Sequence, residues 1–151
     1  MAIRPRVLFL CTENSCRTQM AEAFLRQVTG DEFEIVSAGA EAGHLDSDAV
    51  AAMKEIGIDI SGARPKVVDP YLREKFHYVI TLCDREKERS CPVFPGAIWR
   101  QTWRIEHPAH LEAAGLDRRA AVRHARDTIR RHVDAFVDKY HDSGKGSSVW
   151  T

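Results

Sequence analysis

The chain has 151 residues, a length that suits one domain with a single hydrophobic core. Lys plus Arg equals Asp plus Glu, at 22 each, so no net charge favours nucleic acid or an acidic membrane surface, and any anion site must be local. The apolar run that follows the N-terminal arginines is too short for a signal peptide or a membrane span. We therefore expect a cytoplasmic protein with neither a nucleic-acid nor a membrane partner.

Four cysteines stand out in this composition, namely Cys11, Cys16, Cys83 and Cys91. In the reducing cytosol they should be free thiols at rest, and spaced cysteines there favour catalysis or metal binding over structural disulfides. No pair has the two-residue spacing of zinc ligands, so we expect no metal and no bound cofactor.

The first part of the chain alternates expected strands with expected helices. The apolar run 7–10 predicts a strand buried on both faces. Apolar residues at helical spacing over 20–28 predict a helix that Gly30 ends. Residues 33–37 predict a second strand, which ends in Ala38-Gly39.

The middle of the chain continues this alternation. Asp46, or the serine after it, is a typical helix cap, and Gly57 ends the helix that follows. Pro70 predicts the start of a short helix. The run 78–82 predicts a third strand, with Cys83 at its carboxyl end.

The last elements are a strand and a long helix. Residues 97–99 predict a short fourth strand, and apolar residues on one face over 118–140 predict a helix. We expect one domain over 1–140 and a flexible Gly/Ser-rich tail over 141–151. Strands alternating with helices predict an α/β fold with a parallel sheet, whose ligands bind beyond the carboxyl ends of the strands.

A Cys-x5-Arg pattern lies between the first strand and the first helix. A short loop that enters a helix turns its free N–H groups toward one point, which forms a cradle for an anion. Arg17 adds a planar, two-pronged donor for a tetrahedral oxyanion, and the same positive field favours the thiolate form of Cys11. Thr18 or Ser15 is positioned to donate a hydroxyl hydrogen bond to that thiolate, and Asn14 tolerates a left-handed backbone. The plain alternative is a buried strand-end thiol beside a surface arginine.

We expect the whole loop to bind the oxyanion. Its members are Thr12, Glu13, Asn14, Ser15, Cys16, Arg17 and Thr18.

These motifs closely resemble those of the thioredoxin-coupled arsenate reductases, which share the fold of the low-molecular-weight protein tyrosine phosphatases. The resemblance covers roughly residues 6–140. It implies a three-layer α/β sandwich around a central four-stranded parallel sheet. The matching segments are residues 7–22, 37–39, 57–61 and 79–83, the Cys91-Pro92 pair and Trp103.

The resemblance implies reduction of arsenate to arsenite in arsenic detoxification. A second thiol must attack the Cys11 sulfur so that arsenic leaves with two electrons. In the resembling family the disulfide passes from Cys11–Cys83 to Cys83–Cys91, and thioredoxin then reduces it, so we expect thioredoxin as partner and a monomer. The alternative is that Cys83 and Cys91 are idle thiols in a charged surface stretch. Cys16 fills the interior of the loop, or pairs with Cys11 under oxidation.

Two other functions stay open. A phosphatase acting on phosphotyrosine or small phosphate esters would use the same loop, but its Asp-Pro general acid lies late in the chain. Asp69-Pro70-Tyr71 comes before the third strand, so we interpret it as a helix start. A non-catalytic oxyanion or redox sensor would keep the loop without turnover.

The resembling reductases carry an Asp-Pro shortly after the matching tryptophan, and this chain departs from that pattern. His107 precedes Pro108 here and takes the position of the acid. An imidazolium at His107 would supply the proton that expels hydroxide from arsenate, or the neighbouring Glu106 would substitute. If neither acts, the first step is slow.

A second set of departures surrounds the loop. Some family members bind potassium through residues matching Asn14, Glu22 and Ser37, plus an aspartate where this chain has Lys66. The lysine either places its ammonium at the cation position or is exposed to solvent. Glu13 stands where glycine is common in the resembling family, and a carboxylate beside an anion cradle is mildly unfavourable unless its side chain points outward.

Overall fold

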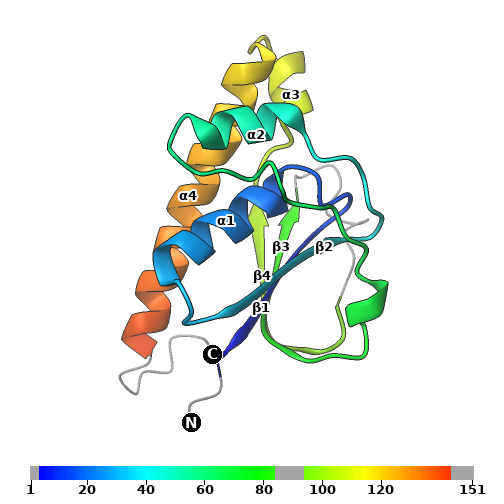
Figure 1. Cartoon of the computed structure of the whole chain (residues 1–151), viewed down its shortest axis with the longest axis vertical. Helices are drawn as coiled ribbons and strands as arrows, with labels where there is room; N and C mark the ends of the chain where they lie inside the picture. Colours follow the sequence, from blue (N-terminus) through cyan, green and yellow to red (C-terminus); the bar gives the residue numbers. More distant parts are fainter. Residues whose placement is uncertain (1–3, 84–93, 144–151) are drawn as a thin grey trace.

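The computed structural model describes residues 4–83 and 94–143. Four parallel strands form one sheet in the order β2-β1-β3-β4, which confirms the predicted α/β class. The strands are β1 (Arg6–Cys11), β2 (Glu34–Gly39), β3 (Phe76–Cys83) and β4 (Ala97–Arg104). Their carboxyl ends all point to the upper end of the molecule in Figure 1.

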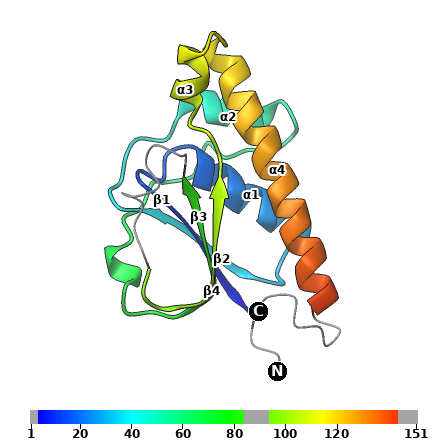
Figure 2. The ribbon, with the colours of Figure 1, turned by 180° about the vertical axis from the view of Figure 1, so that it is seen from behind.

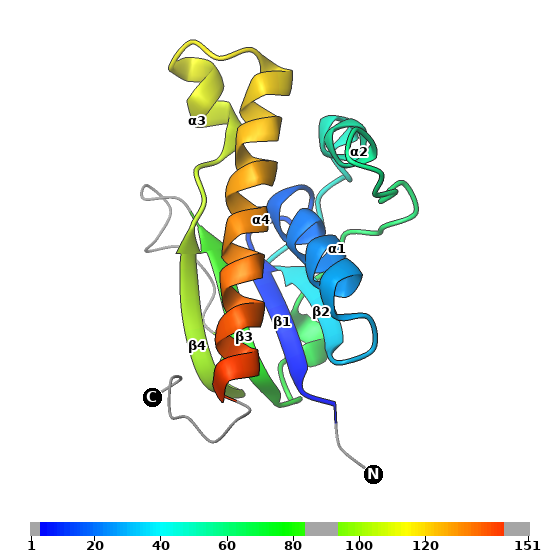
Figure 3. The ribbon, with the colours of Figure 1, turned by 90° about the vertical axis from the view of Figure 1, so that its left-hand side faces the viewer.

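Helices cover one face of this sheet. α1 and α4 lie side by side in front of it in Figure 3, and α2 packs against α4. The helices are α1 (Arg17–Thr29), α2 (Ser47–Lys54), α3 (Pro108–Ala113) and α4 (Arg118–Ser143), with the 3-10 turn η1 (Asp69–Tyr71). η1 lies on the side away from α4, as Figures 1 and 2 both show. Together these elements form the layers of the expected sandwich.

Each sheet face carries its own apolar cluster. The larger cluster joins β1 and β3 to α1, α2 and α4, and Phe9, Phe24 and Ile80 are among its buried members. The smaller cluster lies on the opposite face, where Leu10, Val79 and Phe94 are buried. Because β1 and β3 are buried on both faces, they are continuous apolar runs in the sequence.

Two helix ends follow the predicted signals, and a third does not. Asp46 caps α2 by accepting hydrogen bonds from the backbone N–H groups of Asp48 and Ala49. Gly30 ends α1 with a φ of 56°, a left-handed conformation that glycine adopts readily. α2 ends at Lys54, before the predicted Gly57, which instead turns the following segment with a positive φ.

In the C-terminal half, three elements differ from the sequence expectation. β4 runs over Ala97–Arg104 and is longer than predicted, because its alternating polar residues belong to an exposed edge strand. α3 was not expected, and His107 is its N-cap. α4 continues to Ser143, so three residues of the predicted tail are helical. The remainder of that tail lies outside the described residues.

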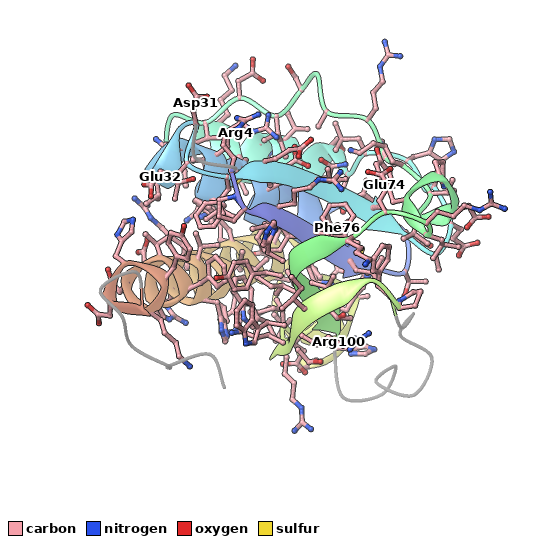
Figure 4. All side chains as sticks on the ribbon, turned by 90° about the horizontal axis from the view of Figure 1, so that it is seen from below. Arg4, Asp31, Glu32, Glu74, Phe76 and Arg100 are labelled. Carbon is pink, nitrogen blue, oxygen red and sulfur yellow. The ribbon has the colours of Figure 1, made fainter. Side chains whose placement is uncertain are left out.

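The amino end of the sheet is held by one arginine. The Arg6 guanidinium lies 4.2 Å from the centre of the Phe76 ring and forms ion pairs with Glu34 and Glu74. Figure 4 looks onto this end and shows Glu74 beside Phe76. These contacts link the amino end of β1 to those of β2 and β3. They lie at the end of the sheet opposite to Cys11 and Cys83. Over the described residues, no helix has the length and apolar character that a membrane crossing needs.

Candidate active site

Cys11 and Cys83 end two neighbouring strands. Leu10 of β1 lies beside Thr81 of β3 in the parallel register, so both strands reach the same edge of the sheet within one residue of each other. The turn from β1 to α1 lies at this edge, at the upper end of the sheet in Figure 1. This is the edge beyond which parallel α/β folds bind their ligands.

The backbone of the β1–α1 loop is held by the segment that follows β2. The carbonyls of Cys11, Thr12, Glu13 and Ser15 each accept a backbone hydrogen bond from residues 40–46, at 2.9–3.0 Å. These bonds turn the loop carbonyls outward. The following backbone N–H groups stand at the start of α1, where the helix dipole favours an anion. The loop therefore has the local arrangement that an anion cradle requires, and its role in binding an oxyanion stays a prediction.

Gly39 allows the segment after β2 to pass close to the backbone of the β1–α1 loop. A Cβ atom at this position would lie 2.7 Å from the Glu41 carbonyl oxygen, 2.8 Å from that of Thr12 and 2.9 Å from the Asn14 nitrogen. All three neighbours are backbone atoms, which cannot move aside without reshaping the loop. The sequence analysis assigned this glycine only to the end of a strand.

The Cys11 thiol is buried and faces two donors. The backbone N–H of Asn14 lies 3.0 Å from its Sγ, and the Thr18 hydroxyl lies 3.2 Å from it. Asn14 adopts the left-handed conformation expected from the sequence, with a φ of 56°. Of the two hydroxyls considered for this contact, that of Thr18 makes it, whereas Ser15 lines the neighbouring cavity.

The contacts of Asn14 show which atom is the donor between the Thr18 hydroxyl and the Cys11 sulfur. The Asn14 Oδ1 atom accepts from the Lys66 backbone N–H at 2.9 Å and from Gln19 at 3.0 Å, which fixes the orientation of the amide. Its Nδ2 group therefore donates to the Thr18 oxygen, at 2.8 Å. The Thr18 hydroxyl keeps its own hydrogen for the Cys11 sulfur. Two hydrogen-bond donors therefore point at the Cys11 sulfur.

Arg17 is anchored from across the site. Its guanidinium is buried, and Nη1 donates to the Ile105 carbonyl oxygen at 2.7 Å. Ile105 follows β4, two residues before His107, so the same connection fixes the arginine and carries the histidine. No sequence signal could have identified this carbonyl, because any residue type supplies one.

A small cavity of about 60 Å³ opens at the loop. Glu106 is exposed and is not one of its lining residues, so His107 is the better placed of the two acid candidates. The Nδ1 atom of His107 accepts from the Ala109 backbone N–H at 3.0 Å, so the neutral ring carries its hydrogen on Nε2. The imidazolium form would have to give up this N-cap bond, because both of its ring nitrogens are donors. The cavity is lined by Cys11, Thr12, Glu13, Ser15, Cys16, Arg17 and His107.

Asn14 and Thr18, the other two predicted oxyanion-binding residues, lie behind the cavity and turn toward the thiol. Glu13 is exposed, although it also lines the cavity.

Cys16 stands at the N-cap of α1 and is buried. Burial raises the pKa of its thiol to about 12, and the negative charge of Asp46 adds to that effect. The thiol therefore stays protonated at neutral pH, unlike a nucleophile. This agrees with its assignment as a residue that fills the loop interior.

The residues matching a potassium site are engaged with one another. Ser37 donates to Glu22 at 2.5 Å, and Arg26 pairs with the same carboxylate at 2.7 Å. Lys66 directs its ammonium to the Arg64 carbonyl, while its backbone N–H holds Asn14. The Arg26 guanidinium on α1 thus balances the negative charge of Glu22, one of the residues that match the potassium site.

The remaining candidates are only partly described. The backbone of Cys83 ends β3, whereas Cys91 lies outside the described residues. Asp69 and Pro70 lie in η1, as the sequence predicted for a helix start, and neither lines the loop cavity.

Comparisons with known proteins agree with this geometry. The arsenate reductases of Halalkalibacterium halodurans and Bacillus subtilis are 40% and 38% identical over 132 residues, which cover 87% of this chain and 94% of each relative. A solved arsenate reductase in a phosphate-binding state superposes with a TM-score of 0.75 at 27% identity, covering 89% of this chain and 98% of that one.

The model of one protein family, low molecular weight phosphotyrosine protein phosphatase, matches residues 6–141. The chain belongs to this family, and among its members it resembles the arsenate reductases.

Proposed function

We propose that the chain reduces arsenate to arsenite, with Cys11 as the nucleophile. The observation that carries the proposal is the position of its sulfur, which faces the Asn14 N–H and the Thr18 hydroxyl at the edge of a small anion cavity. Arg17 lines the same cavity and holds a tetrahedral oxyanion. The identity to named arsenate reductases supports arsenate as that oxyanion.

The first step joins sulfur to arsenic. The Cys11 thiolate attacks arsenate, a sulfur–arsenic bond forms, and one arsenic–oxygen bond breaks. The departing hydroxide takes a proton from His107 and leaves as water. Arg17 and the loop N–H groups hold the remaining oxygens while this charge moves.

The second step transfers two electrons. Cys83 attacks the Cys11 sulfur, a disulfide forms, and the sulfur–arsenic bond breaks with its electron pair left on arsenic, which departs as arsenite. Cys91 then attacks Cys83, which frees Cys11 and moves the disulfide outward. Thioredoxin reduces the Cys83–Cys91 disulfide in the cytoplasm. The adjacent ends of β1 and β3 support the first of these exchanges.

A phosphatase would share the loop and differ only in the fate of the adduct. Water would then displace phosphate from Cys11, and no second thiol would be needed. Asp69, the one acid in an Asp-Pro pair, does not line the cavity in the described part of the chain. The phosphatase therefore ranks second.

The test is arsenate-dependent NADPH oxidation with thioredoxin and thioredoxin reductase, together with arsenite counted per protein. Cys11→Ser should abolish turnover. Cys91→Ser should release one equivalent of arsenite and stall with Cys11 joined to Cys83, which peptide mapping detects. Cys83→Ser should release little arsenite, because nothing displaces the adduct.

Each rival predicts a different pattern. A phosphatase would hydrolyse an aryl phosphate in both Cys83→Ser and Cys91→Ser, and a sensor would show no turnover even in the wild type. Repeated turnover of Cys91→Ser with thioredoxin would contradict the outward relay.

A further inference from the structure

Gln19 is a polar side chain that α1 buries beside the loop. It lies on the first turn of the helix and is only 3% exposed. Its Nε2 group is within reach of three oxygens, the Asn14 carbonyl at 3.1 Å, the Asn14 Oδ1 at 3.0 Å and the Arg64 carbonyl at 3.3 Å. Three acceptors around one nitrogen identify this end of the side chain as the amino group.

These contacts place Gln19 against Asn14, which contacts the Cys11 sulfur directly and holds the Thr18 hydroxyl beside it. Asn14 is fully buried and has a left-handed backbone, which asparagine tolerates better than most residues with a Cβ atom but which its neighbours must still hold in place. Gln19 binds both its peptide oxygen and its side-chain oxygen. The Lys66 backbone N–H is the second donor to that side-chain oxygen. Together they fix both the backbone and the amide of Asn14.

We propose that Gln19 is a positioning residue for the nucleophile, acting through Asn14. It keeps the Asn14 N–H on the Cys11 sulfur and, through the Asn14 amide, keeps the Thr18 hydroxyl hydrogen on the same atom. Gln19 does not line the anion cavity and does not touch the substrate. The proposal rests on Cys11 being the nucleophile of the proposed function, but not on which oxyanion it attacks.

Removal of the Gln19 amide leaves the Asn14 carbonyl without this donor, while the side-chain Oδ1 keeps only the Lys66 backbone N–H. The Asn14 backbone should then depart more easily from its positive φ, which would swing its N–H away from the Cys11 sulfur. The side-chain amide is held by one donor in place of two, so the hydrogen-bond direction of Thr18 is less firmly set. Both changes weaken the hydrogen bonds to the Cys11 sulfur, which would stabilise a negative charge on it.

The experiment follows alkylation of Cys11 by iodoacetamide across pH, by mass spectrometry of its peptide. Gln19→Leu should move the midpoint of this profile upward by about one pH unit, so that Cys11 reacts about tenfold more slowly at neutral pH. Gln19→Glu should shift it further, because an ionised carboxylate cannot donate to Asn14. Gln27→Leu, an exposed change on the same helix, should leave the profile unchanged.

A double-mutant cycle tests whether Gln19 acts through Asn14. Asn14→Gly accepts the left-handed backbone but has no side-chain amide, so it should shift the profile by itself. Adding Gln19→Leu to it should give a shift smaller than the sum of the two single shifts. Thermal unfolding checks that each variant folds, and Gln19→Met replaces Gln19→Leu if the latter does not.

An unchanged alkylation midpoint in a folded Gln19→Leu or Gln19→Met protein would overturn the proposal. Fully additive shifts would also overturn it, because they would mean that Gln19 acts without Asn14. Alkylation needs no arsenate, so its outcome is independent of the substrate. A wild type that reacts normally with iodoacetamide but reduces no arsenate would refute the proposed function alone.

Discussion

Arg17→Lys separates the geometry of the arginine from its charge. In the wild type, Nη1 donates to the Ile105 carbonyl at 2.7 Å, which leaves the other guanidinium nitrogens for the oxyanion. A lysine has a single ammonium group, which cannot bind the Ile105 carbonyl and the oxyanion in the way that separate guanidinium nitrogens can. The variant therefore loses either an oxyanion contact or its own anchor.

The expected magnitude follows from one lost hydrogen bond. A hydrogen bond to a charged group contributes about 1.5–3 kcal/mol, so kcat/KM for arsenate should fall about 10- to 150-fold. Where the Ile105 carbonyl loses its donor, an unsatisfied buried acceptor costs about 1–3 kcal/mol in the free energy of unfolding. Arsenate kinetics and urea unfolding measure the two effects separately.

Arg26→Lys is the matched control, since this arginine lies on the same helix with its side chain exposed. The control should retain both activity and stability. If Arg17→Lys reduced arsenate with the kcat/KM of the wild type, the two-pronged role of the guanidinium would be refuted.

Three further predictions concern titratable groups. Since the pKa of Cys16 is raised to about 12, iodoacetamide should label Cys11 in the native protein and spare Cys16, and equal labelling would contradict the burial argument. Hydrogen bonds and ion pairs with two arginines of α4 lower the pKa of Glu55 from 4.5 to about 2, so its stabilising effect is complete above pH 4.5 and disappears as the pH falls through 2. Glu55→Gln should therefore be less stable than the wild type in urea at neutral pH, with a difference that narrows on acidification. If His107 donates its proton as an imidazolium, activity should decline above about pH 6.5. His107→Ala should then be less active, and its activity should no longer decline above that pH. His107→Asp should retain turnover. An unchanged pH profile in His107→Ala would assign the proton to another donor.

The sheet was predictable because its central strands carry their own signal. Residues 7–10 and 78–82 are continuous apolar runs, as two-sided burial requires. The edge strand β4 was underestimated, because its outward residues include Arg100 and Arg104, which read as loop in isolation. α3 was missed, since it is short and begins at a His-Pro pair that resembles a loop.

The local chemistry of the site was also predictable. Asn14 in a left-handed conformation and Thr18 beside the sulfur both follow from the requirements of a tight loop before a helix. The supports that come from distant segments were not. Gln19 resembles a solvent-facing helix residue until the segment around Arg64 packs over it. The Ile105 carbonyl has no sequence signature at all.

The close contact between Gly39 and the β1–α1 loop affects how an alanine scan of this protein would be interpreted. An alanine scan scores a position by lost activity, and Gly39→Ala should score as high as Cys11, although it removes no functional group. Its added methyl would meet the backbone of Thr12 and Asn14 and push the loop out of shape. The end of β2 therefore belongs to the active site by the space that it leaves empty. A list of the side chains that act in the site would leave β2 out, because Gly39 contributes no side chain to it.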